Sequence, residues 1–443
     1  MDMTDNESLI ETTLGMRPAD WQVVPLEELG TKFHGGGTPS TKKPEYWDGN
    51  IPWTTSVYID EKLFLNQCAG YITQLGLDNC SSQLVPKGNL LIGTRVGVGK
   101  VAINQFDTAI SQDLTALIVD QKKVDPVYLV YAIRTEATQR TILSATRGTT
   151  IKGIPRADLI KVQIALPPLS EQRRIAAVLN AIQEAVAAQE DVIAAARAFK
   201  RSLMARLFTY GPGRTPAVTK ETAIGEVPAH WEVVGLKDVA VIGNGSTPKR
   251  TNPQYWTEGT IPWLTSTRIH DQFIGHADEL VTILARQECH LPMVPKDSIL
   301  VAITGQGKTL GNAALTTFET TINQHLAYIT IQRQDVIPEF VLRYLQYRYE
   351  DLRQAGQAGG STKAALTCGL LKLYPLPLPS SEEQRSIAEI VRAADEKIAA
   401  EEDRKAALQS LFQSMLHQLM TGQVRLVGGD GAFPEGAADR SVD

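Results

Sequence analysis

Cysteine and histidine are scarce in this chain, and neither forms a pattern with chemical meaning. Of 443 residues, four are cysteine and seven are histidine. The cysteines have neither the short spacing of zinc ligands nor the density of a disulfide framework; they are Cys68, Cys80, Cys289 and Cys368. We therefore expect no metal centre and a reducing, cytoplasmic environment.

Long apolar runs are also lacking. No run approaches the ~20 residues that a membrane span needs. The start MDMTDNESLIE has no basic stretch followed by an apolar one, so we expect no signal peptide. The composition of residues 427–443 indicates a disordered tail. With 43% hydrophobic and 21% charged residues, the chain as a whole has the composition of a folded protein with a core.

A surplus of positive charge is absent from the chain as a whole. The net charge of −5 argues against nucleic acid at first sight, but acidic residues on a remote face would not prevent binding. Between Arg134 and Lys161, six basic residues stand against two acidic ones, a local net charge of +4. Basic pairs also occur at Lys42-Lys43 and Lys249-Arg250. Such charges are typical of a solvated surface or of a face that binds an anion.

Aromatic residues make up only 6% of the chain, which makes its six tryptophans informative. They form three pairs whose members lie 209 or 210 residues apart: Trp21 with Trp231, Trp47 with Trp256, and Trp53 with Trp263. The sequence segments around them repeat as well: PEYWDGNIPWTTS begins at Pro44, and PQYWTEGTIPWLTS begins at Pro253. The chain therefore consists of two copies of one domain-sized unit, about 12–211 and 222–422.

Each copy begins with β-rich runs and ends with a long helical pattern. Runs such as NLLIGTRV and DSILVAIT, broken by Gly, Pro, Asn and Asp, indicate strands joined by turns. We therefore predict a mixed α/β fold with an internal two-fold repeat. The predicted β-rich domains are 12–166 and 222–378, and the predicted helices are 167–211 and 379–422.

Both helical segments carry an apolar stripe, with apolar residues mostly three or four positions apart. A lone helix of ~40 residues, ~60 Å long, would leave its stripe in water, so we expect the two helices to form an antiparallel coiled coil and the molecule to resemble a dumbbell. The alternative is two core helices inside compact domains, although such helices rarely exceed ~25 residues. The packing residues that we predict are Ile175, Ile182, Leu203, Leu207, Ile387, Ile398, Leu411 and Leu419.

No motif with catalytic chemistry is complete. The stretch Gly305–Thr309 resembles the end of a P-loop, but the first glycine of that motif would fall at Ala302. The stretch Asn252–Tyr255 differs from the Asn-Pro-Pro-Tyr of adenine methyltransferases at its third residue. Paired acids in a nuclease pattern and an activated nucleophile are missing too. We therefore expect a chain without catalytic residues.

The order of these features resembles the specificity subunit of type I restriction-modification systems over nearly the whole chain, about 14–426. The motifs that carry the resemblance are Gly37-Thr38-Pro39, Tyr46-Trp47, Ile51-Pro52-Trp53, Gly148 to Ile154, Glu171-Gln172-Arg173 and Leu419 to Gly422. The second copy departs from the family pattern at residues 360–366, where the family tends to have Ile-Gly-Ile-like residues.

The resemblance implies that the β-rich domains are target recognition domains and that the helices are spacers. Because the two domains differ in sequence, the DNA target would be bipartite and asymmetric. Polar residues on loops beside the tryptophan blocks would read bases: Ser40, Lys42, Lys43, Tyr58, Lys249, Arg250, Arg268 and His270. Four further residues suit phosphates: Arg95, Lys100, Lys152 and Lys308.

Partners and cofactors follow from the same resemblance. Two methyltransferase (M) subunits would pack on the helices and modify adenines, and two motor-nuclease (R) subunits would cleave unmodified DNA. S-adenosylmethionine, ATP and Mg²⁺ would belong to those partners. Two alternatives stay open: a self-contained methyltransferase or nuclease, and a coiled-coil scaffold that does not touch DNA.

Overall fold

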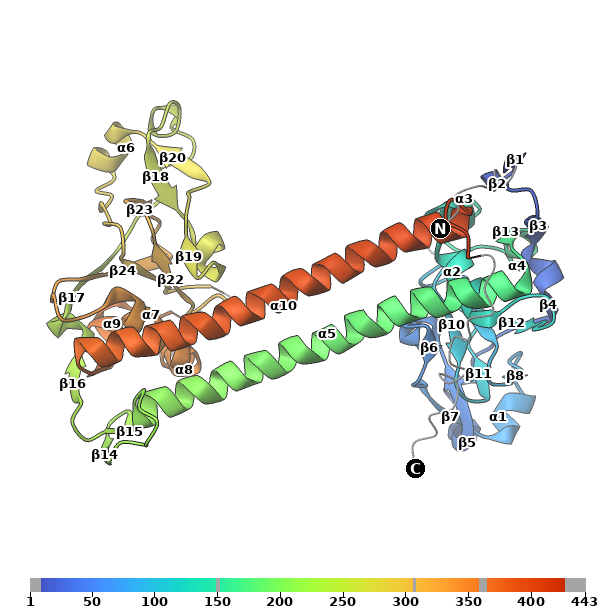
Figure 1. Ribbon diagram of the computed structural model, residues 1–443, viewed down its shortest axis with the longest axis horizontal. Helices are drawn as coiled ribbons and strands as arrows, with labels where there is room; N and C mark the ends of the chain where they lie inside the picture. Colours follow the sequence, from blue (N-terminus) through green and yellow to red (C-terminus); the bar gives the residue numbers. More distant parts are fainter. Residues whose placement is uncertain (1–8, 149–151, 306–307, 358–364, 427–443) are drawn as a thin grey trace, which may run out of the picture. The chain divides into compact units, whose positions relative to one another are not determined.

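The computed structural model describes residues 9–148, 152–305, 308–357 and 365–426. The predicted tail, 427–443, and most of the atypical stretch 360–366 lie outside these residues. The chain divides into two compact units, one formed by 1–189 with 404–443 and the other by 190–403. Each unit therefore combines one β-rich domain with a part of each long helix (Figure 1).

A five-stranded sheet lies at the centre of the first unit, in the order β4-β12-β9-β10-β6. The apolar run of β9 is buried on both faces. Leu90 and Ile92 pack with the helix α2. Leu91 points to the opposite face, where it packs with Ile110 of a smaller, four-stranded sheet. The strands are β4 (Gly30–Gly35), β6 (Phe64–Leu65), β9 (Leu90–Gly93), β10 (Val101–Asn104) and β12 (Leu114–Val119), and α2 is Pro126–Arg134.

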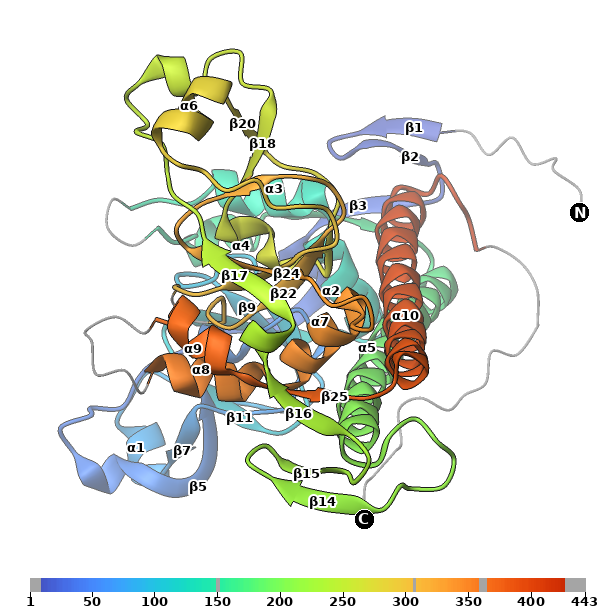
Figure 2. The ribbon, with the colours of Figure 1, turned by 90° about the vertical axis from the view of Figure 1, so that its left-hand side faces the viewer.

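A four-stranded sheet, β7-β5-β11-β8, carries the first tryptophan block, and two short ladders complete the first domain. The strand β13 pairs with β3 where the chain leaves the domain, and β1 pairs with β2 as a hairpin (Figure 2). These elements are β1 (Leu9–Thr12), β2 (Gly15–Pro18), β3 (Gln22–Pro25), β5 (Trp47–Thr54), β7 (Gly70–Ile72), β8 (Leu84–Val85), β11 (Thr108–Ile110) and β13 (Gln163–Leu166). Three short helices accompany them: α1 (Gln74–Asp78), α3 (Glu136–Ser144) and α4 (Arg156–Leu159).

The second unit repeats this topology, except that the isolated bridge between Val294 and Thr320 replaces the pairing of β8 with β11. Its central sheet has the order β17-β24-β21-β22-β19, and its smaller sheet the order β20-β18-β23. The strands are β14 (Thr219–Thr222), β15 (Gly225–Pro228), β16 (Glu232–Gly235), β17 (Ala240–Asn244), β18 (Ile261–Leu264), β19 (Phe273–Ile274), β20 (Glu279–Val281), β21 (Ile299–Ala302), β22 (Ala313–Thr316), β23 (Thr321–Ile322), β24 (Leu326–Ile331) and β25 (Pro375–Leu378). The short helices are α6 (Ile283–Glu288), α7 (Pro338–Tyr347), α8 (Tyr349–Gln357) and α9 (Cys368–Leu373).

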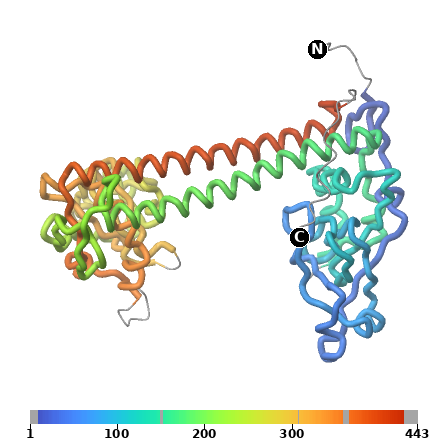
Figure 3. Tube along the Cα trace, turned by 60° about the horizontal axis from the view of Figure 1, so that its bottom comes forward, coloured from blue at the N-terminus to red at the C-terminus, as the bar shows by residue number. Residues whose placement is uncertain are grey.

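The two long helices are α5 (Leu169–Tyr210) and α10 (Ser381–Thr421) (Figures 1 and 3). Each is followed by a glycine in the left-handed region, Gly211 with φ of 79° and Gly422 with φ of 74°. Glycine adopts this conformation without steric cost, which is why it commonly ends a helix.

The repeated Glu-Gln-Arg motif anchors the start of each long helix. The buried Gln172 side chain donates to the carbonyl of Pro167 (2.8 Å) and accepts from the backbone N–H of Asp125 (2.9 Å). Gln384 makes the same contacts with Pro379 (2.9 Å) and Ile337 (2.8 Å). Each glutamine thus supplies partners for backbone groups that burial would otherwise leave unpaired.

The preceding glutamates hold the first tryptophan of each copy. The Trp21 indole donates to Glu171 (3.2 Å), and the Trp231 indole donates to Glu383 (3.2 Å). Glu171 is buried and also accepts from the guanidinium of Arg425 at 2.8 and 3.0 Å. A carboxylate at this depth requires such a partner.

The start of one long helix packs with the end of the other in both units, so the helices run antiparallel. In the first unit, Ile175 and Leu179 share a core with Leu416 and Leu419. The matching cluster in the second unit contains Met204, Leu207 and Phe208 of α5 with Ile387 and Val391 of α10. The predicted mixed α/β fold, with its repeat and its paired long helices, is confirmed.

Burial of the predicted packing residues follows this pairing, with one exception. Ile175, Leu207, Ile387 and Leu419 are buried, and Ile182, Leu203 and Ile398 are partly buried. Leu411 is 46% exposed and lies in none of the core clusters, so its predicted packing is not seen. Successive residues turn a helix by ~100°, which places Leu411 on the flank of the stripe formed by Phe412, Met415, Leu416 and Leu419.

Charged residues also connect the helices within the second unit. Asp395 of α10 contacts Lys200 of α5 and accepts from Arg343 of α7 at 2.8 Å. The Arg343 side chain is fully buried, and Glu339 is its second carboxylate partner, at 3.2 Å. This buried guanidinium is therefore compensated by two acids.

Within the described ranges, no helix has the length and apolar character to cross a membrane. In the same part of the chain, no group of three or more His, Cys, Asp or Glu residues is arranged to hold a metal ion.

Candidate nucleic-acid interface

The repeated tryptophan pairs are scaffold for the loop that precedes them. Trp47 and Trp53 meet edge to face with ring centroids 5.3 Å apart, and Trp256 and Trp263 do the same at 5.2 Å. Their indole N–H groups donate to loop carbonyls: Trp53 to Gly37 (3.0 Å), Trp47 to Ser40 (3.2 Å), Trp263 to Ser246 (3.2 Å) and Trp256 to Lys249 (3.2 Å). The repeated tryptophan-containing segments thus fix the shape of an exposed loop in each domain.

In the first domain, this loop presents the predicted residues Ser40, Lys42 and Lys43, all exposed. The Lys43 ammonium donates to the Tyr46 hydroxyl (2.9 Å), a hydrogen bond that raises the pKa of Lys43. Tyr58 is 40% exposed and follows the strand β5. The loop therefore carries positive charge and hydroxyl groups on a rigid support.

In the second domain, two predicted arginines are bound by acids of their own domain. Arg250 lies 4.0 Å from the Trp256 ring and forms a two-pronged pair with Glu279, whose pKa this contact lowers. Arg268 forms a similar pair with Asp278, whose pKa is also lowered. Each arginine would have to break its ion pair before it could contact DNA.

The other predicted residues of the second domain are more accessible. Lys249 is exposed on the loop that matches Lys42 and Lys43, and Lys308 is exposed as well. The His270 Nδ1 atom accepts from the side-chain amide of Asn312 (3.0 Å).

Beside the first loop lies a cleft of about 560 Å³ with three arginines in its lining, Arg95, Arg147 and Arg156. Arg156 lies so close to Gly35 that a Cβ atom at Gly35 would come within 2.2 Å of its guanidinium. The cleft therefore depends on a glycine that leaves room for a cation. Arg147 is paired with Asp158 at 2.7 Å, whereas Arg95 is exposed.

Backbone hydrogen bonds join several of the residues that line this cleft. Arg147 and Gly153 exchange two backbone hydrogen bonds (2.8 and 2.9 Å), and the Ile154 N–H donates to the Thr94 carbonyl (2.8 Å). Lys152, which precedes Gly153, is exposed at the same edge. Lys100 lies apart from the cleft lining, and its ammonium donates to the carbonyl of Ile59 (3.0 Å).

Sequence reasoning singled out Arg95 and Lys152 but did not select Arg147 or Arg156 as site residues. The only signal for them was their membership of the basic stretch from 134 to 161. Their role in the cleft depends on a fold that brings this stretch against Gly35 and Gly36, more than 100 residues earlier.

The second domain has the same backbone at this place but different side chains. The Leu366 N–H donates to Ile303 (2.8 Å) as Ile154 does to Thr94, and the Ile303 N–H donates to His325 (3.0 Å) as Thr94 does to Asp113 (2.7 Å). By this correspondence, Thr304 stands where the first domain has Arg95.

The same correspondence puts Cys368 in place of Arg156 and His325 in place of Asp113. Thr304 and His325 are hydrogen-bonded to each other, with 2.5 Å between Oγ1 and Nδ1. Gln112 and Gln324 occupy matching places in the two domains. Gln112 contacts Thr38, and Gln324 contacts Thr247, each on the loop that the tryptophan pair supports. The two domains therefore present one arginine-rich surface and one largely neutral surface on the same scaffold.

A repeated recognition scaffold with exchanged polar residues, combined with paired long helices, defines the class of DNA specificity proteins of type I restriction-modification systems. A family model described as the type I restriction modification DNA specificity domain matches residues 18–195 and 228–410. The chain belongs to this family.

Relatives of the chain carry corresponding names. The chain is 24% identical to the type I restriction enzyme MjaIX specificity subunit of Methanocaldococcus jannaschii, covering 94% of this chain and 96% of that protein. It is 26% identical to the putative MjaX specificity subunit of the same organism, covering 95% and 97%.

Solved structures share the fold. A chain from a study of complex assembly and conformational transition of the type I R-M system has a TM-score of 0.64, with 20% identity over 92% of this chain and 99% of that one. The S subunit from M. genitalium has a TM-score of 0.53, with 17% identity over 95% and 98%. The predicted resemblance to the specificity subunit is confirmed by the family match and by the relatives.

Proposed function

We propose that the chain reads two separate short sequences on one DNA duplex, one through each β-rich domain. The observation that carries this proposal is the pair of matching surfaces, built on the same backbone and the same tryptophan pair. Arg95 and Arg156 on the first surface are replaced by Thr304 and Cys368 on the second. One scaffold with two sets of polar side chains suits two half-sites of different sequence, so the target is asymmetric.

The first surface suits a half-site that contains guanine. A guanidinium offers two parallel donors to the O6 and N7 atoms in the major groove, a contact that also discriminates against the other bases. Arg95 is exposed at the cleft, so we assign it to a base contact in place of the phosphate contact that the sequence suggested. Lys152 at the edge suits a phosphate, because a lone ammonium positions the backbone without reading sequence.

The second surface suits a different half-site. Thr304, His325 and Gln324 present neutral donors and acceptors, whereas Lys249 and Lys308 supply charge for the phosphates. Arg250, Arg268 and His270 stay candidates for base contacts, as do Ser40, Lys42, Lys43 and Tyr58 in the first domain. Lys100 stays a candidate for a phosphate.

We place the chemistry in partner subunits, two methyltransferase and two motor-nuclease subunits, which would also hold S-adenosylmethionine, ATP and Mg²⁺. The chain itself would be non-catalytic. Exposed apolar side chains on the long helices support a partner at this surface. Val192 and Phe199 lie seven residues apart on α5, hence on one face, and are 45% and 64% exposed.

Methylome sequencing tests the proposal. A host that expresses this chain with its methyltransferase partner should show one methylated motif with two specified half-sites of different sequence and an unspecified gap. A single uninterrupted methylated motif would refute the proposal that each β-rich domain recognises its own half-site.

The placement of the chemistry has its own test. Ultraviolet crosslinking with labelled S-adenosylmethionine should mark the methyltransferase partner in the complex and leave the purified chain unlabelled. Specific labelling of the chain alone would establish it as an enzyme. Absence of salt-dependent binding to any duplex by the complex would instead favour a scaffold.

A further inference from the structure

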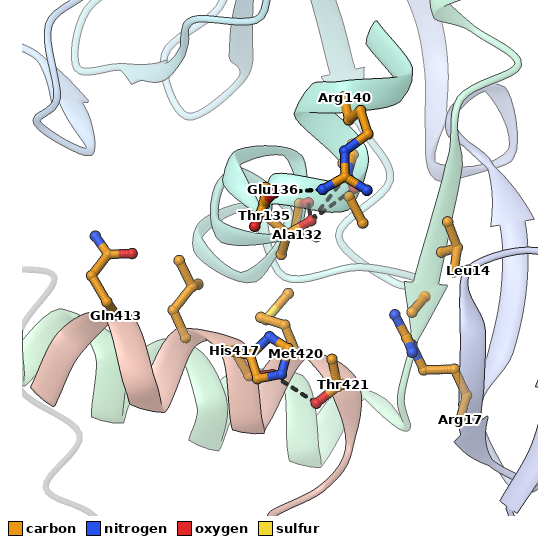
Figure 4. A pocket seen from close by; sticks show the side chains of 14 residues that line it. Leu14, Arg17, Ala132, Thr135, Glu136, Arg140, Gln413, His417, Met420 and Thr421 are labelled. Carbon is orange, nitrogen blue, oxygen red and sulfur yellow. Dashed lines mark hydrogen bonds and ion pairs between the residues drawn. The ribbon is translucent and has the colours of Figure 1, made fainter. Parts of the chain in front are cut away.

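The first unit contains a second cavity, which shares no lining residue with the cleft described above and has a volume of about 520 Å³ (Figure 4). It lies among the strand β2, the start of α3 and the last turns of α10. Its apolar lining includes Leu14, Leu416 and Met420. The volume falls within the range of ~300 to 1,000 Å³ that is typical of small-molecule sites.

A buried guanidinium stands in this cavity without a counter-charge. Arg17 is only 7% exposed, and Figure 4 shows its head group directed into the cavity from β2. One of its terminal nitrogens donates to the carbonyl of Met16 (2.7 Å), whereas its Nε has no hydrogen-bond partner. Among the described residues, no carboxylate forms an ion pair with it within 4.0 Å.

Two acids of the same unit, one of them in the cavity lining, are committed elsewhere. Glu171 binds Arg425 and Trp21, and Glu136 points to Arg140 with its side chain 87% exposed. Burial lowers the pKa of Arg17, because removal from water penalises its charged form. A guanidinium in this position is costly for the fold unless an anion joins it.

The opposite wall of the cavity also favours an anion. The helix α3 begins at Glu136, and Thr135 to Thr138 line the cavity. First-turn N–H groups of a helix have no acceptor within the helix; here that of Thr138 donates to the Thr135 hydroxyl (3.4 Å), and the helix dipole places partial positive charge at this end. Arg140, one turn further along α3, and His417 of α10 add polar groups to the lining (Figure 4).

The second unit shows that the fold does not require this arrangement. In the matching hairpin, Val227 stands where β2 has Arg17, since Val227 pairs with Lys220 as Arg17 pairs with Ile10. The matching space there is only about 170 Å³. Its lining includes Phe208 and Tyr347, whose rings stack with their centroids 5.0 Å apart.

We propose that the cavity beside Arg17 binds a small organic anion. A carboxylate or phosphate group would lie between Arg17 and the start of α3, and an apolar body would rest on Leu416 and Met420. Because α10 supplies part of the lining, the ligand would stabilise the docking of this helix in the first unit. The proposal is independent of DNA binding.

Thermal unfolding and calorimetry of the full chain test this site. The probes are hexanoate, hexyl phosphate and the uncharged hexanamide, with inorganic phosphate as a measure of general salt effects. We expect the two charged organic probes to raise the unfolding midpoint by a few degrees at millimolar concentration. Hexanamide, which keeps the apolar body but loses the charge, should bind at least tenfold more weakly.

The substitution Arg17→Val, copied from the second unit, separates a binding role from a structural one. We expect it to abolish the response to the charged probes without lowering the midpoint of the unliganded chain. The exposed Arg214→Val is the matched control and should respond like the natural chain. Arg17→Gln, which keeps a polar side chain, gives a second measurement if the valine variant does not fold.

Three results would overturn the proposal. Equal probe responses in the natural chain and the Arg17 variants would exclude the site. So would the absence of binding by both charged probes. A large loss of midpoint in both variants, with no probe effect, would show that Arg17 stabilises the fold and does not hold a ligand.

Discussion

At the residue scale, the two domains differ where their backbones agree. Thr94 and Ile303 make equivalent hydrogen bonds, yet the next residue is Arg95 in one domain and Thr304 in the other. A side chain that varies on a fixed backbone can change what is read without changing the fold. Substitutions at these positions should therefore affect recognition far more than stability.

Arg95→Ala should relax the first half-site and leave the second unchanged. Loss of a two-pronged contact to guanine costs about 1–3 kcal/mol of discrimination. Methylome sequencing of the variant would show tolerated bases at one position of one half-site. Thr304→Ala is the matched change in the other domain and should affect only the other half-site; a general loss of methylation by Arg95→Ala would contradict base reading.

Lys152→Ala should weaken binding to all sequences alike. A phosphate contact contributes charge without sequence information, so the slope of log affinity against log salt should fall by about one charge. Binding to specific and unrelated duplexes at several salt concentrations measures this slope. An altered sequence preference would assign Lys152 to base reading instead.

Glu383 makes the second unit sensitive to acid. Burial alone would raise the pKa of Glu383, but hydrogen bonds from His230 (2.9 Å), Trp231 (3.2 Å) and Ser380 (2.9 Å) outweigh it and lower the pKa. A lowered pKa in the folded state means stability that is present above the unfolded value, about 4.3, and is lost as pH falls through the folded value.

Glu383→Gln should therefore lower the unfolding midpoint at pH 7, and its difference from the natural chain should shrink below about pH 4. Thermal unfolding between pH 3 and 7 measures this difference. The exposed neighbour Glu382→Gln is the control and should show little effect at any pH. A difference that does not change with pH would show that the charge of Glu383 is not what stabilises the helix start.

At the scale of elements, the long helices offer a means to change the spacing between half-sites. Inserting a second Ala-Ala-Ala-Arg beside residues 194–197 would lengthen α5 by ~6 Å and turn it ~40° beyond a full turn. If α10 slips to keep its stripe paired, the unread gap should grow by one or two base pairs, since DNA rises ~3.4 Å per pair.

Methylome sequencing reads out this insertion. Both half-site sequences should be retained while the gap lengthens. Arg197→Ala, which removes the ion pair with Glu402 without adding length, should leave the gap unchanged. An active insertion variant with the original gap would show that the helices do not set the spacing.

At the scale of the whole molecule, the two recognition surfaces should act independently. Replacing residues 21–165 by the matching domain of a relative should change one half-site and leave the other alone. Methylome sequencing compares the two half-sites directly. If both changed together, recognition would have to be coupled through the chain.

The architecture could be predicted from the sequence because its signals are local or repeated. Three tryptophan pairs revealed the two copies, and the period of apolar residues revealed the helices. Contacts between distant residues left no such signal: Arg156 meets Gly35, and Arg17 shares a cavity with His417. Spacing alone also does not give the centre of the buried stripe, as the exposed Leu411 shows.

The way each unit is completed also bears on the order in which a ribosome delivers the chain. The first unit comprises residues 1–189 and 404–443, and its core includes Leu416, Leu419 and Met420. The second unit needs only residues 190–403. During synthesis, the first unit therefore cannot complete its core until the end of α10 has been made, and until then Trp21 and Ile175 lack part of their packing. The second unit can complete its fold before that point. The domain that is synthesised first is therefore the one that completes its core last.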